Sequence, residues 1–501
     1  MAANRSDEFS PVFLARDLRV IEARASELRT TSLMELAGLE AAKFARERIG
    51  EGRKRILIFA GPGNNGGDAL VAARHLKQWW FDVSVIFTGD AEKLPLDARN
   101  AFDAWITAGG SVHTSAPSSS DLGFIIDGLF GIGLSRAPDS RHATLIEQIN
   151  TSGVPVLALD IPSGLMSDTG QVPGKAVHAS FTLTFLGLKP GLLTLHGPDL
   201  CGEVQLRTLG VAQAELLATR GWKIESALLS KVLQPRPKNS HKGMFGNVGI
   251  IGGDSGMLGA SLLAGRAALK LGAGRVYVGT LGNEAAAVDW LQPELMMREA
   301  REVARMDDLD ALVVGPGLGQ SSSARALLNS SLKHACPVVL DADALNLLAL
   351  DEFAARMTVK RDGLTIVTPH PAEAGRLLQS SSAAVQADRI GAALAIAARF
   401  HSATVIKGAG SICASVDGNW YINTSGNPGM ASAGMGDVLA GMIGAFLGQG
   451  AAVSGALLSA VHLHGLAADA LCADRIGHVG LTASEVTDSA RRIFNRLQTQ
   501  V

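Results

Sequence analysis

Short aliphatic runs that end in or just before glycine recur through the first half of the chain, and helical patterns separate them. The runs are RILIFAG (55–61), VSVIFTG (83–89), FIIDGLFG (124–131) and VPVLALDIPSG (154–164). An amphipathic segment, DALVAARHLKQWW (68–80), separates the first two, and a longer helical region (13–49) precedes them all. Continuous apolar strands that alternate with helices are typical of a parallel sheet covered on both faces. The pattern predicts a doubly wound, three-layer α/β/α fold for this half.

The same alternation resumes after residue 246. Its strand-like runs are NVGIIGG (247–253), GRVYVGT (274–280), ALVVGPG (311–317), PVVLDAD (337–343), LTIVTPH (364–370) and ATVIKGAG (403–410). Between the halves, QPRPKNSHKGMFG (234–246) has two prolines, three cationic side chains and two glycines. We interpret this segment as the boundary region, although a long surface loop would have the same composition. The 501 residues are therefore expected to form two α/β domains, 1–226 and 227–501.

Charge and cysteine content exclude several classes of protein. Acidic and basic side chains nearly cancel (47 against 45, net −2), so no surface for nucleic acid or an anionic membrane is expected. The four cysteines are scattered, which argues against a disulfide framework or a zinc site. Residues 1–20 carry charges throughout, and no apolar stretch of about 20 residues lacks glycines and charges. We expect a cytoplasmic protein with neither a secretory signal nor a membrane span.

Polar side chains follow three strands of the first half. GPGNNGGD (61–68) can bring backbone N–H groups to a phosphate at a helix start, although a plain glycine-rich turn is the alternative. DGLFGIGLSR (127–136) and LDIPSGL (159–165) add carboxylates at two more strand ends, and the first of these could be a capped turn. Ligands of open α/β sheets bind at such ends. Asn, Asp and Ser oxygens without His or Cys favour a hard cation over zinc.

These segments, with SLMELAG (32–38), resemble the YjeF N-terminal family of NAD(P)H-hydrate epimerases over roughly residues 10–225. The resemblance implies a Rossmann-like domain and a potassium ion held by Asn65, Asp127 and Ser163. It implies that the hydrated dinucleotide contacts Asn64, Asn65, Gly66, Gly67, Asp68, Gly131, Ile132, Gly133, Leu134, Ser135, Arg136, Ala137 and Asp160. Asp160 would lie at the reacting ring, and an ionised aspartate suits a base. Ile132 replaces the usual Thr of the family and removes a hydroxyl.

The second half contains several glycine-rich strand-to-helix loops. IGGDSGMLGASLLAGRAALKLGAG (251–274) and GPGLG (315–319) suit an anion, while DADALN (341–346) and TPHPAE (368–373) place acids at strand ends. VIKGAGS (405–411) could equally be the start of a hairpin. In GMASAGMGDVLAGM (429–442), Gly434 and Gly436 open a helix whose amides can stabilise phosphoryl charge. Asp437 in the first turn can accept a proton from a hydroxyl, or can simply cap the helix.

This half resembles the YjeF C-terminal family over roughly residues 227–495, through TPHPAE, KGAGS and GMGD in that order. The resemblance implies a ribokinase-like fold and an ADP- or ATP-dependent NAD(P)H-hydrate dehydratase. Hydrate contacts fall on Ala260, Gly317, Gly319, His370 and Asp437. The nucleotide would lie against Lys407, Gly408, Ala409, Gly410, Ser411 and Gly436. Glu373 occupies the acid position of an NxxE motif near magnesium, with His370 in place of the Asn.

Together the two resemblances imply repair of hydrated NADH and NADPH. The first domain would interconvert the R and S epimers, with Asp160 assisting proton transfer and potassium organising the pocket. The second would phosphorylate the S hydroxyl with Asp437 as base, magnesium neutralising the transferred charge, and phosphate loss would regenerate the cofactor. A homo-oligomer is expected, and ADP is favoured over ATP. The alternative is a small-alcohol or vitamin-precursor kinase with a non-catalytic dinucleotide-binding module.

Overall fold

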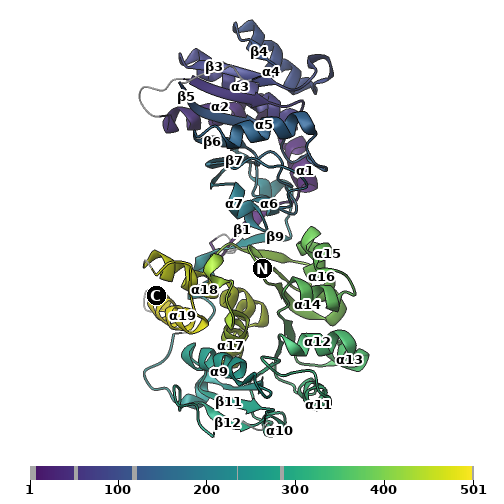
Figure 1. Cartoon of the computed structure of the whole chain (residues 1–501), viewed down its shortest axis with the longest axis vertical. Coiled ribbons are helices and arrows are strands. Elements are labelled where there is room, and N and C mark those ends of the chain that lie inside the picture. The colour runs from purple at the N-terminus through teal and green to yellow at the C-terminus, as the bar shows by residue number, and fades with distance from the viewer. Residues whose placement is uncertain are drawn as a thin grey trace. The chain divides into compact units, whose positions relative to one another are not determined.

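The chain divides into two compact units in the computed structural model, which describes residues 7–49, 55–115, 121–233, 235–282, 287–474 and 476–498. One unit is Pro11–Arg220, and the other combines Met1–Ser10 with Gly221–Val501. Both are α/β units, as predicted, and Figure 1 shows each with its own sheet and helices. The division lies at 220/221, where the sequence predicted 226/227.

One segment that the sequence assigned to the first domain, at the start of the chain, belongs to the C-terminal unit. Strand β1 (Phe9–Val12) begins within it, because β1 lies beside β9 (Gly221–Ile224) at the edge of its sheet. The segment predicted as a boundary, of which 235–246 is described, also packs on this unit. Its 3₁₀ turn η3 (Lys242–Phe245) accepts a backbone hydrogen bond from Gly274 N to Phe245 O at 2.9 Å. The prolines and charges of 235–246 therefore belong to a surface segment of the C-terminal unit.

The N-terminal unit is built on a seven-stranded parallel sheet of order β4-β3-β2-β5-β6-β7-β8. Its strands are β2 (Arg55–Ala60), β3 (Asp82–Phe87), β4 (Val112–His113), β5 (Leu122–Gly128), β6 (Val156–Leu159), β7 (Phe181–Phe185) and β8 (Glu203–Arg207). Strands β4, β7 and β8 were not predicted. The order reverses between β2 and β5, which creates a crevice at the carboxyl ends of these strands.

Helices cover both faces of this sheet, because successive strand side chains point to opposite faces. In β2, Ile56 and Ile58 join one core, while Leu57 and Phe59 join another. The helices of the unit are α1 (Ala15–Glu27), α2 (Leu33–Arg48), α3 (Asn64–Gln78), α4 (Leu96–Thr107), α5 (Ser140–Asn150), α6 (Pro190–Leu193), α7 (Gly197–Leu200) and α8 (Gln213–Leu216), with η1 (Ala91–Lys93). The predicted region 13–49 contains α1 and α2.

The C-terminal unit contains an eleven-stranded sheet of order β1-β9-β18-β17-β16-β15-β14-β13-β10-β11-β12. Strands from β16 to β12 run parallel, and β17 is antiparallel to both its neighbours. The strands not yet bounded are β10 (Asn247–Gly252), β11 (Arg275–Thr280), β12 (Met296–Glu299), β13 (Ala311–Val314), β14 (Val338–Leu340), β15 (Thr365–Val367), β16 (Ser402–Ile406), β17 (Ser411–Ala414) and β18 (Trp420–Asn423). Each predicted strand of this half is present.

A large apolar core lies between this sheet and the helices α9, α17, α18 and α19. The helices of the unit are α9 (Leu258–Lys270), α10 (Ala300–Val303), α11 (Ser322–Ser331), α12 (Asp343–Leu350), α13 (Glu352–Lys360), α14 (Pro371–Leu377), α15 (Ser382–Ala387), α16 (Arg389–Phe400), α17 (Met435–Gly448), α18 (Val453–Ala473) and α19 (Ala483–Gln498), with η2 (Ser226–Ser230) and η4 (Pro428–Met430). Among the described residues, α18 alone is long and apolar enough to cross a membrane, but 72% of its apolar window is buried. Such burial is typical of a core helix.

Candidate functional sites

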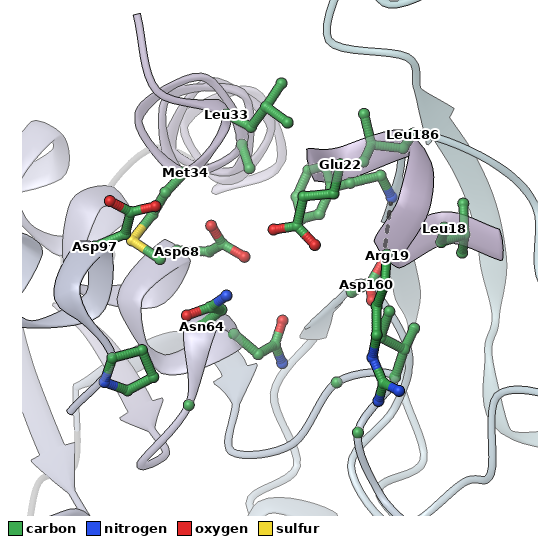
Figure 2. Close-up of a pocket in the computed structure, with 18 of the residues that line it drawn as sticks. Leu18, Arg19, Glu22, Leu33, Met34, Asn64, Asp68, Asp97, Asp160 and Leu186 are labelled. Atoms are coloured by element: carbon green, nitrogen blue, oxygen red, sulfur yellow. Dashed lines mark hydrogen bonds between the residues drawn. The ribbon is translucent and has the colours of Figure 1, made fainter. Parts of the chain in front are cut away.

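A cavity of about 980 Å³ opens at the crevice of the N-terminal unit. Its size is that of a ligand pocket. Loops after β2, β5, β6, β7 and β8 line it together with α1, α2 and the start of α4. Figure 2 shows Asp68 and Glu22 with their carboxyl groups turned toward each other across the pocket, and Asp160 below Glu22. The predicted residues that line it are Asn64, Asn65, Asp68, Gly131, Ile132, Gly133, Leu134, Ser135, Arg136 and Asp160.

Three predicted contact residues lie outside the cavity lining. Gly66 and Gly67 are buried on the inner side of α3, where a Cβ on Gly66 would lie 2.0 Å from the carbonyl oxygen of Gly61. A Cβ on Gly67 would lie 2.6 Å from Met34. These glycines thus allow the helix start to pack closely against its own loop and against α2. Ala137 ends the predicted phosphate turn and is exposed.

Asp160 forms a buried ion pair that the sequence reasoning did not predict. Lys189 Nζ donates to Asp160 Oδ1, to Thr184 Oγ1 at 2.7 Å and to the Phe185 carbonyl at 3.0 Å. The Lys189 side chain is 1% exposed and that of Asp160 is 14% exposed. Burial lowers the pKa of Lys189, and the negative charge of Asp160 opposes this without cancelling it. A lone lysine within the apolar segment 181–195 was the available clue.

Asp160 also adopts a strained backbone conformation. Its φ is +65°, in the left-handed region that non-glycine residues rarely adopt. Its N–H donates to Leu183 O at 2.8 Å, and its Oδ1 accepts from Phe185 N at 3.3 Å. The chain therefore turns sharply at the end of β6 and points the carboxylate at Lys189 and the cavity.

Other acids surround Asp160 in the cavity. Burial, with the negative charges of Asp160 and Glu22, raises the pKa of Asp68 well above its ordinary value. Burial and Asp160 also raise the pKa of Glu22. Asp97, at the start of α4, is a further carboxylate on the wall. Glu22 and Asp97 were not predicted, because neither belongs to a motif and only folding brings them beside Asp68.

The three residues predicted to hold potassium are brought together behind the turn 131–136. Asp127 accepts from Ser163 N at 2.8 Å and from Ser163 Oγ at 2.6 Å. Asn65 Nδ2 donates to the Phe130 carbonyl at 2.9 Å. Asn65 Oδ1 is buried and has no hydrogen-bond partner among the described residues. Burial raises the pKa of Asp127 to about 6, against the effect of its hydrogen bonds. A cluster of carboxylate, hydroxyl, carbonyl and unpartnered amide oxygens fits a hard cation.

In the C-terminal unit, a lysine again pairs with an aspartate at a strand end. Lys407 Nζ lies 2.8 Å from Asp341 Oδ1 and 4.0 Å from Glu373 Oε2. Thr368 Oγ1 donates to the same Asp341 oxygen at 2.7 Å. Burial lowers the pKa of Lys407, but the charges of Asp341 and Glu373 outweigh it, so the pKa is raised. The sequence named DADALN as an acidic strand end without assigning Asp341 a role.

Asp437 lies in the first turn of α17, as predicted. Gly434 precedes the helix with φ of +85°, a conformation that favours glycine. A Cβ on Gly436 would lie 3.2 Å from Lys407 Nζ, so this backbone lies beside the lysine. Burial and the negative charge of Asp341 raise the pKa of Asp437 to about 6, while Lys407 opposes the shift. The helix start therefore places a carboxylate beside N–H groups and a lysine.

The loop 407–410 is the turn of a hairpin, since β16 and β17 run antiparallel. VIKGAGS is thus both the start of a hairpin and a part of the site, because Lys407 lies at the beginning of the hairpin turn. Buried Arg389 holds this turn by donating to the Ala409 carbonyl at 2.6 Å and the Ile406 carbonyl at 3.2 Å. The sequence reasoning missed Arg389, which is an arginine at a helix start outside every motif.

His370 and Glu373 form a capping box at the start of α14. His370 Nδ1 accepts from Ala372 N at 3.1 Å, and Glu373 Oε2 accepts from His370 N at 2.8 Å. Burial and Lys407 lower the pKa of His370, whereas burial raises the pKa of Glu373. These two hydrogen bonds fix the orientation of both side chains and leave Glu373 Oε2 4.0 Å from Lys407 Nζ.

The remaining predicted hydrate residues meet at another loop. A Cβ on Gly317 would lie 3.1 Å from Ala260 Cβ, and a Cβ on Gly319 would lie 2.8 Å from Asp254 Oδ2. Gly317 O accepts from Asp254 N at 2.6 Å. The structure therefore brings Ala260 to the loop of Gly317 and Gly319, which lies more than fifty residues later in the sequence.

Comparisons with known proteins match both halves of the chain. Residues 30–191 match the family model described as YjeF-related protein N-terminus, and residues 248–492 match the model described as NAD(P)H-hydrate dehydratase. The bifunctional NAD(P)H-hydrate repair enzyme Nnr of Escherichia coli (strain K12) is 40% identical over 97% of this chain and 94% of its own length.

Solved structures resemble the C-terminal unit. The ADP/ATP-dependent NAD(P)H-hydrate dehydratase from Bacillus subtilis, co-crystallised with ATP/Mg²⁺, is 33% identical with a TM-score of 0.50, covering 54% of this chain and 96% of that one. A ribokinase-like superfamily protein from Enterococcus faecalis is 26% identical with a TM-score of 0.50, covering 56% and 98%. The C-terminal unit therefore has the predicted ribokinase-like fold.

Proposed function

The chain belongs to the family of bifunctional NAD(P)H-hydrate repair enzymes, and from this premise we propose how its two units divide the work. The protein repairs hydrated NADH and NADPH. Its N-terminal unit epimerises the R and S hydrates, and its C-terminal unit dehydrates the S form at the expense of ADP or ATP. One observation carries the proposal: each unit brings a Lys–Asp ion pair and further carboxyl groups to the carboxyl end of its sheet, beside a glycine-rich helix start.

In the N-terminal unit, the hydrated ring lies beside Asp160 and the phosphates lie against the turn 131–137. This placement is supported by the cavity, which joins Asp160 to the turn and to the start of α3. Backbone N–H groups at a helix start favour an anion. Asp160, fixed by Lys189, exchanges the proton that epimer interconversion requires.

Asn65, Asp127 and Ser163 would hold a potassium ion in this unit. The support is the unpartnered, buried Asn65 Oδ1 beside the Asp127 carboxylate and the Ser163 hydroxyl. A bound cation would supply fixed positive charge behind the phosphate turn. The protein's own part is to fix that turn, which Asn65 Nδ2 and Ser163 Oγ do through Phe130.

In the C-terminal unit, Asp437 removes the proton of the S hydroxyl as its oxygen attacks the terminal phosphorus of the nucleotide. The new bond joins hydroxyl oxygen to phosphorus, and the bond to the bridging oxygen breaks. Phosphate then leaves the ring carbon, which hydroxide does far less readily, and loss of a ring proton restores the double bond. The α17 amides and Lys407 stabilise the transferred negative charge.

Magnesium fits this site as a companion of the nucleotide. Among the described residues no group of three or more His, Cys, Asp and Glu could hold a metal by itself. Glu373 and Asp341 nevertheless gather beside Lys407, and Mg²⁺ is commonly held by one or two carboxylates plus substrate phosphates. Bound magnesium would neutralise the charge of the nucleotide phosphates. Glu373 is the protein ligand that the sequence predicts for it.

We also propose a cytoplasmic homo-oligomer. The four cysteines are free, which agrees with a reducing compartment. Trp290 and Leu291 are 85% and 78% exposed in the single chain. Large apolar side chains with this exposure are typical of a surface that another subunit covers. Sedimentation velocity tests the assembly: a monomer at micromolar concentration would contradict it, and Trp290→Ser should weaken it.

The test of the paired activities follows NADH absorbance after mixed-epimer NADH hydrate is supplied with ADP, ATP or no nucleotide. We expect nucleotide-dependent recovery of both epimers. Asp160→Asn should limit fast recovery to the S fraction, and Asp437→Asn should abolish recovery. A stable phosphorylated small alcohol with no NADH recovery would instead establish the kinase alternative. Unchanged epimer exchange in Asp160→Asn would contradict the catalytic role of Asp160.

A further inference from the structure

The cavity of the N-terminal unit holds more carboxyl groups than substrate binding requires. Asp68 faces Glu22 from α1, Asp97 from α4, and Asp160 with Lys189 from the ends of β6 and β7. Lys189 forms an ion pair with Asp160, and the charge of Arg19 on α1 acts on Glu22. Four acids line this pocket with the buried Lys189, and Arg19, Arg29 and Arg136 lie elsewhere on its wall. Like charges at close range disfavour joint ionisation, so the group of acids is most stable when one of them keeps its proton.

Asp68 is the acid with the strongest reason to stay protonated. It lies on α3, and Figure 2 shows its carboxyl group turned toward that of Glu22. Burial and the neighbouring acids raise its pKa well above the ordinary value. Asp160 differs, because Lys189 Nζ donates a hydrogen bond directly to its carboxyl group. Figure 2 shows the carboxyl groups of Asp68 and Asp160 on different sides of the pocket.

We propose that Asp68 is a second catalytic residue of the epimerase, the proton donor that works opposite Asp160. This inference rests on the proposed function. Asp68 gives its proton to the ring hydroxyl, the carbon–oxygen bond breaks with its electrons on oxygen, and water forms. The ring nitrogen lone pair forms a C=N bond. Water then adds to the other face, the C=N electrons return to nitrogen, and Asp160 takes the proton of the added water. The reverse reaction exchanges the two roles.

Glu22 is a positioning residue in this scheme, because its charge helps to keep the proton on Asp68. The active form is the pair Asp68 and Asp160 carrying one proton. The rate must therefore fall as pH rises and Asp68 ionises. Removing the charge of Glu22 makes ionisation of Asp68 easier, so Glu22→Gln should move this alkaline fall to lower pH.

The experiment uses the full chain without nucleotide, so that dehydration is silent, and follows the R and S epimers of NADH hydrate by chromatography. We expect Asp68→Asn to lower the catalysed exchange rate about 100-fold or more, toward the spontaneous rate, with little change in KM. Asp68→Glu should recover part of the rate. Asp103→Asn, an exposed carboxylate on α4, is the matched control and should behave as the wild type. Conversion of S hydrate with ADP should be unchanged in all variants.

The outcomes separate the inference from the function. Wild-type exchange at the spontaneous rate would overturn the proposed epimerase itself. Wild-type catalysis with an equally active Asp68→Asn would overturn only the role of Asp68. If Asp68→Asn fails to fold by thermal unfolding, Glu22→Gln decides: an alkaline limb that stays at the wild-type pH contradicts the scheme, and a shift to lower pH supports it.

Discussion

At the residue scale, both sites contain a lysine that pairs with a strand-end aspartate, and this lysine is buried in the first site and partly buried in the second. Lys189 fixes Asp160 and Lys407 fixes Asp341. A buried charge without a partner costs several kcal/mol, so each pair is stable only as a pair. The additional hydrogen bonds from Lys189 to Thr184 and Phe185 satisfy its remaining protons. In each site the lysine therefore does two things: it sets the orientation of one acid and the charge seen by its neighbours.

The dehydratase step should depend on pH through Asp437. A base acts only when ionised, and its folded pKa of about 6 is above the ordinary value of 3.8. The rate with S hydrate and ADP should be near its plateau at pH 7, halve near pH 6 and fall about tenfold per pH unit below pH 5. Asp341→Asn removes a like charge and should move the midpoint to lower pH. A flat profile between pH 5 and 7 would exclude Asp437 as base.

The potassium requirement should depend on one amide oxygen. Asn65→Ala deletes the unpartnered Oδ1, and we expect the potassium concentration for half-maximal epimerase rate to rise about tenfold or more. Asn64→Ala is the matched comparison, since the neighbouring side chain is exposed. Titration of potassium chloride against sodium chloride at constant ionic strength measures both. Equal potassium dependence in the two variants would contradict the assignment.

At the scale of elements, function is concentrated where a strand passes into a helix. Helix α3 begins directly at Asn64, and α17 begins at Met435 after a glycine of positive φ. Neither helix has a side-chain cap at its first residue. The free N–H groups of such a start are satisfied by an anion when one is bound. Glycine at the N-cap of both helices therefore explains why no side chain caps them and why their first N–H groups are left for an anion.

Glycine at two positions of the first loop should matter differently. Gly66→Ala places a Cβ 2.0 Å from the Gly61 carbonyl oxygen, so the N-terminal unit should lose about 1–3 kcal/mol. Gly63→Ala meets nothing within 4 Å and has an ordinary extended φ of −115°, so stability should hold or rise slightly. Calorimetric unfolding compares the variants. A stabilised Gly66→Ala would show that helix propensity outweighs the contact.

At the scale of the whole molecule, the two ends of the sequence belong to one unit. Phe9 lies in the C-terminal core with its ring centroid 5.2 Å from that of Tyr421. Phe13, four positions later, is buried in the N-terminal unit against α1. The chain thus starts in one domain, folds the other, and returns at Gly221. The two units therefore cannot be separated by dividing the sequence at a single position.

Phe9→Ala and Phe13→Ala should therefore destabilise different units. Each removes a buried ring, and we expect a loss of about 3–5 kcal/mol, in the C-terminal transition for Phe9→Ala and in the N-terminal transition for Phe13→Ala. ADP with magnesium identifies the C-terminal transition by raising its temperature. The reverse assignment, or a shift of both transitions together, would contradict two independently folding units.

The sequence by itself determined the elements and the chemistry at their ends. Aliphatic runs ending at glycine predicted strands such as β2, β10 and β13, because local polarity and turn chemistry depend on neighbours in the chain. For the same reason the motifs placed Asp160 at the end of a strand, β6, and Asp437 in the first turn of a helix, α17. Short polar strands, such as β4 and β8, had no local pattern strong enough to be predicted.

Only the tertiary structure decided which residues meet. Lys189, Glu22 and Arg389 lie outside every motif, and each acquires its role from a partner far away in the sequence. β1 joins a sheet whose other strands begin more than two hundred residues later. The reason is physical, because burial and Coulomb interaction depend on the distance between groups in space. In a chain that folds into sheets, this distance does not follow from the separation of the residues along the sequence.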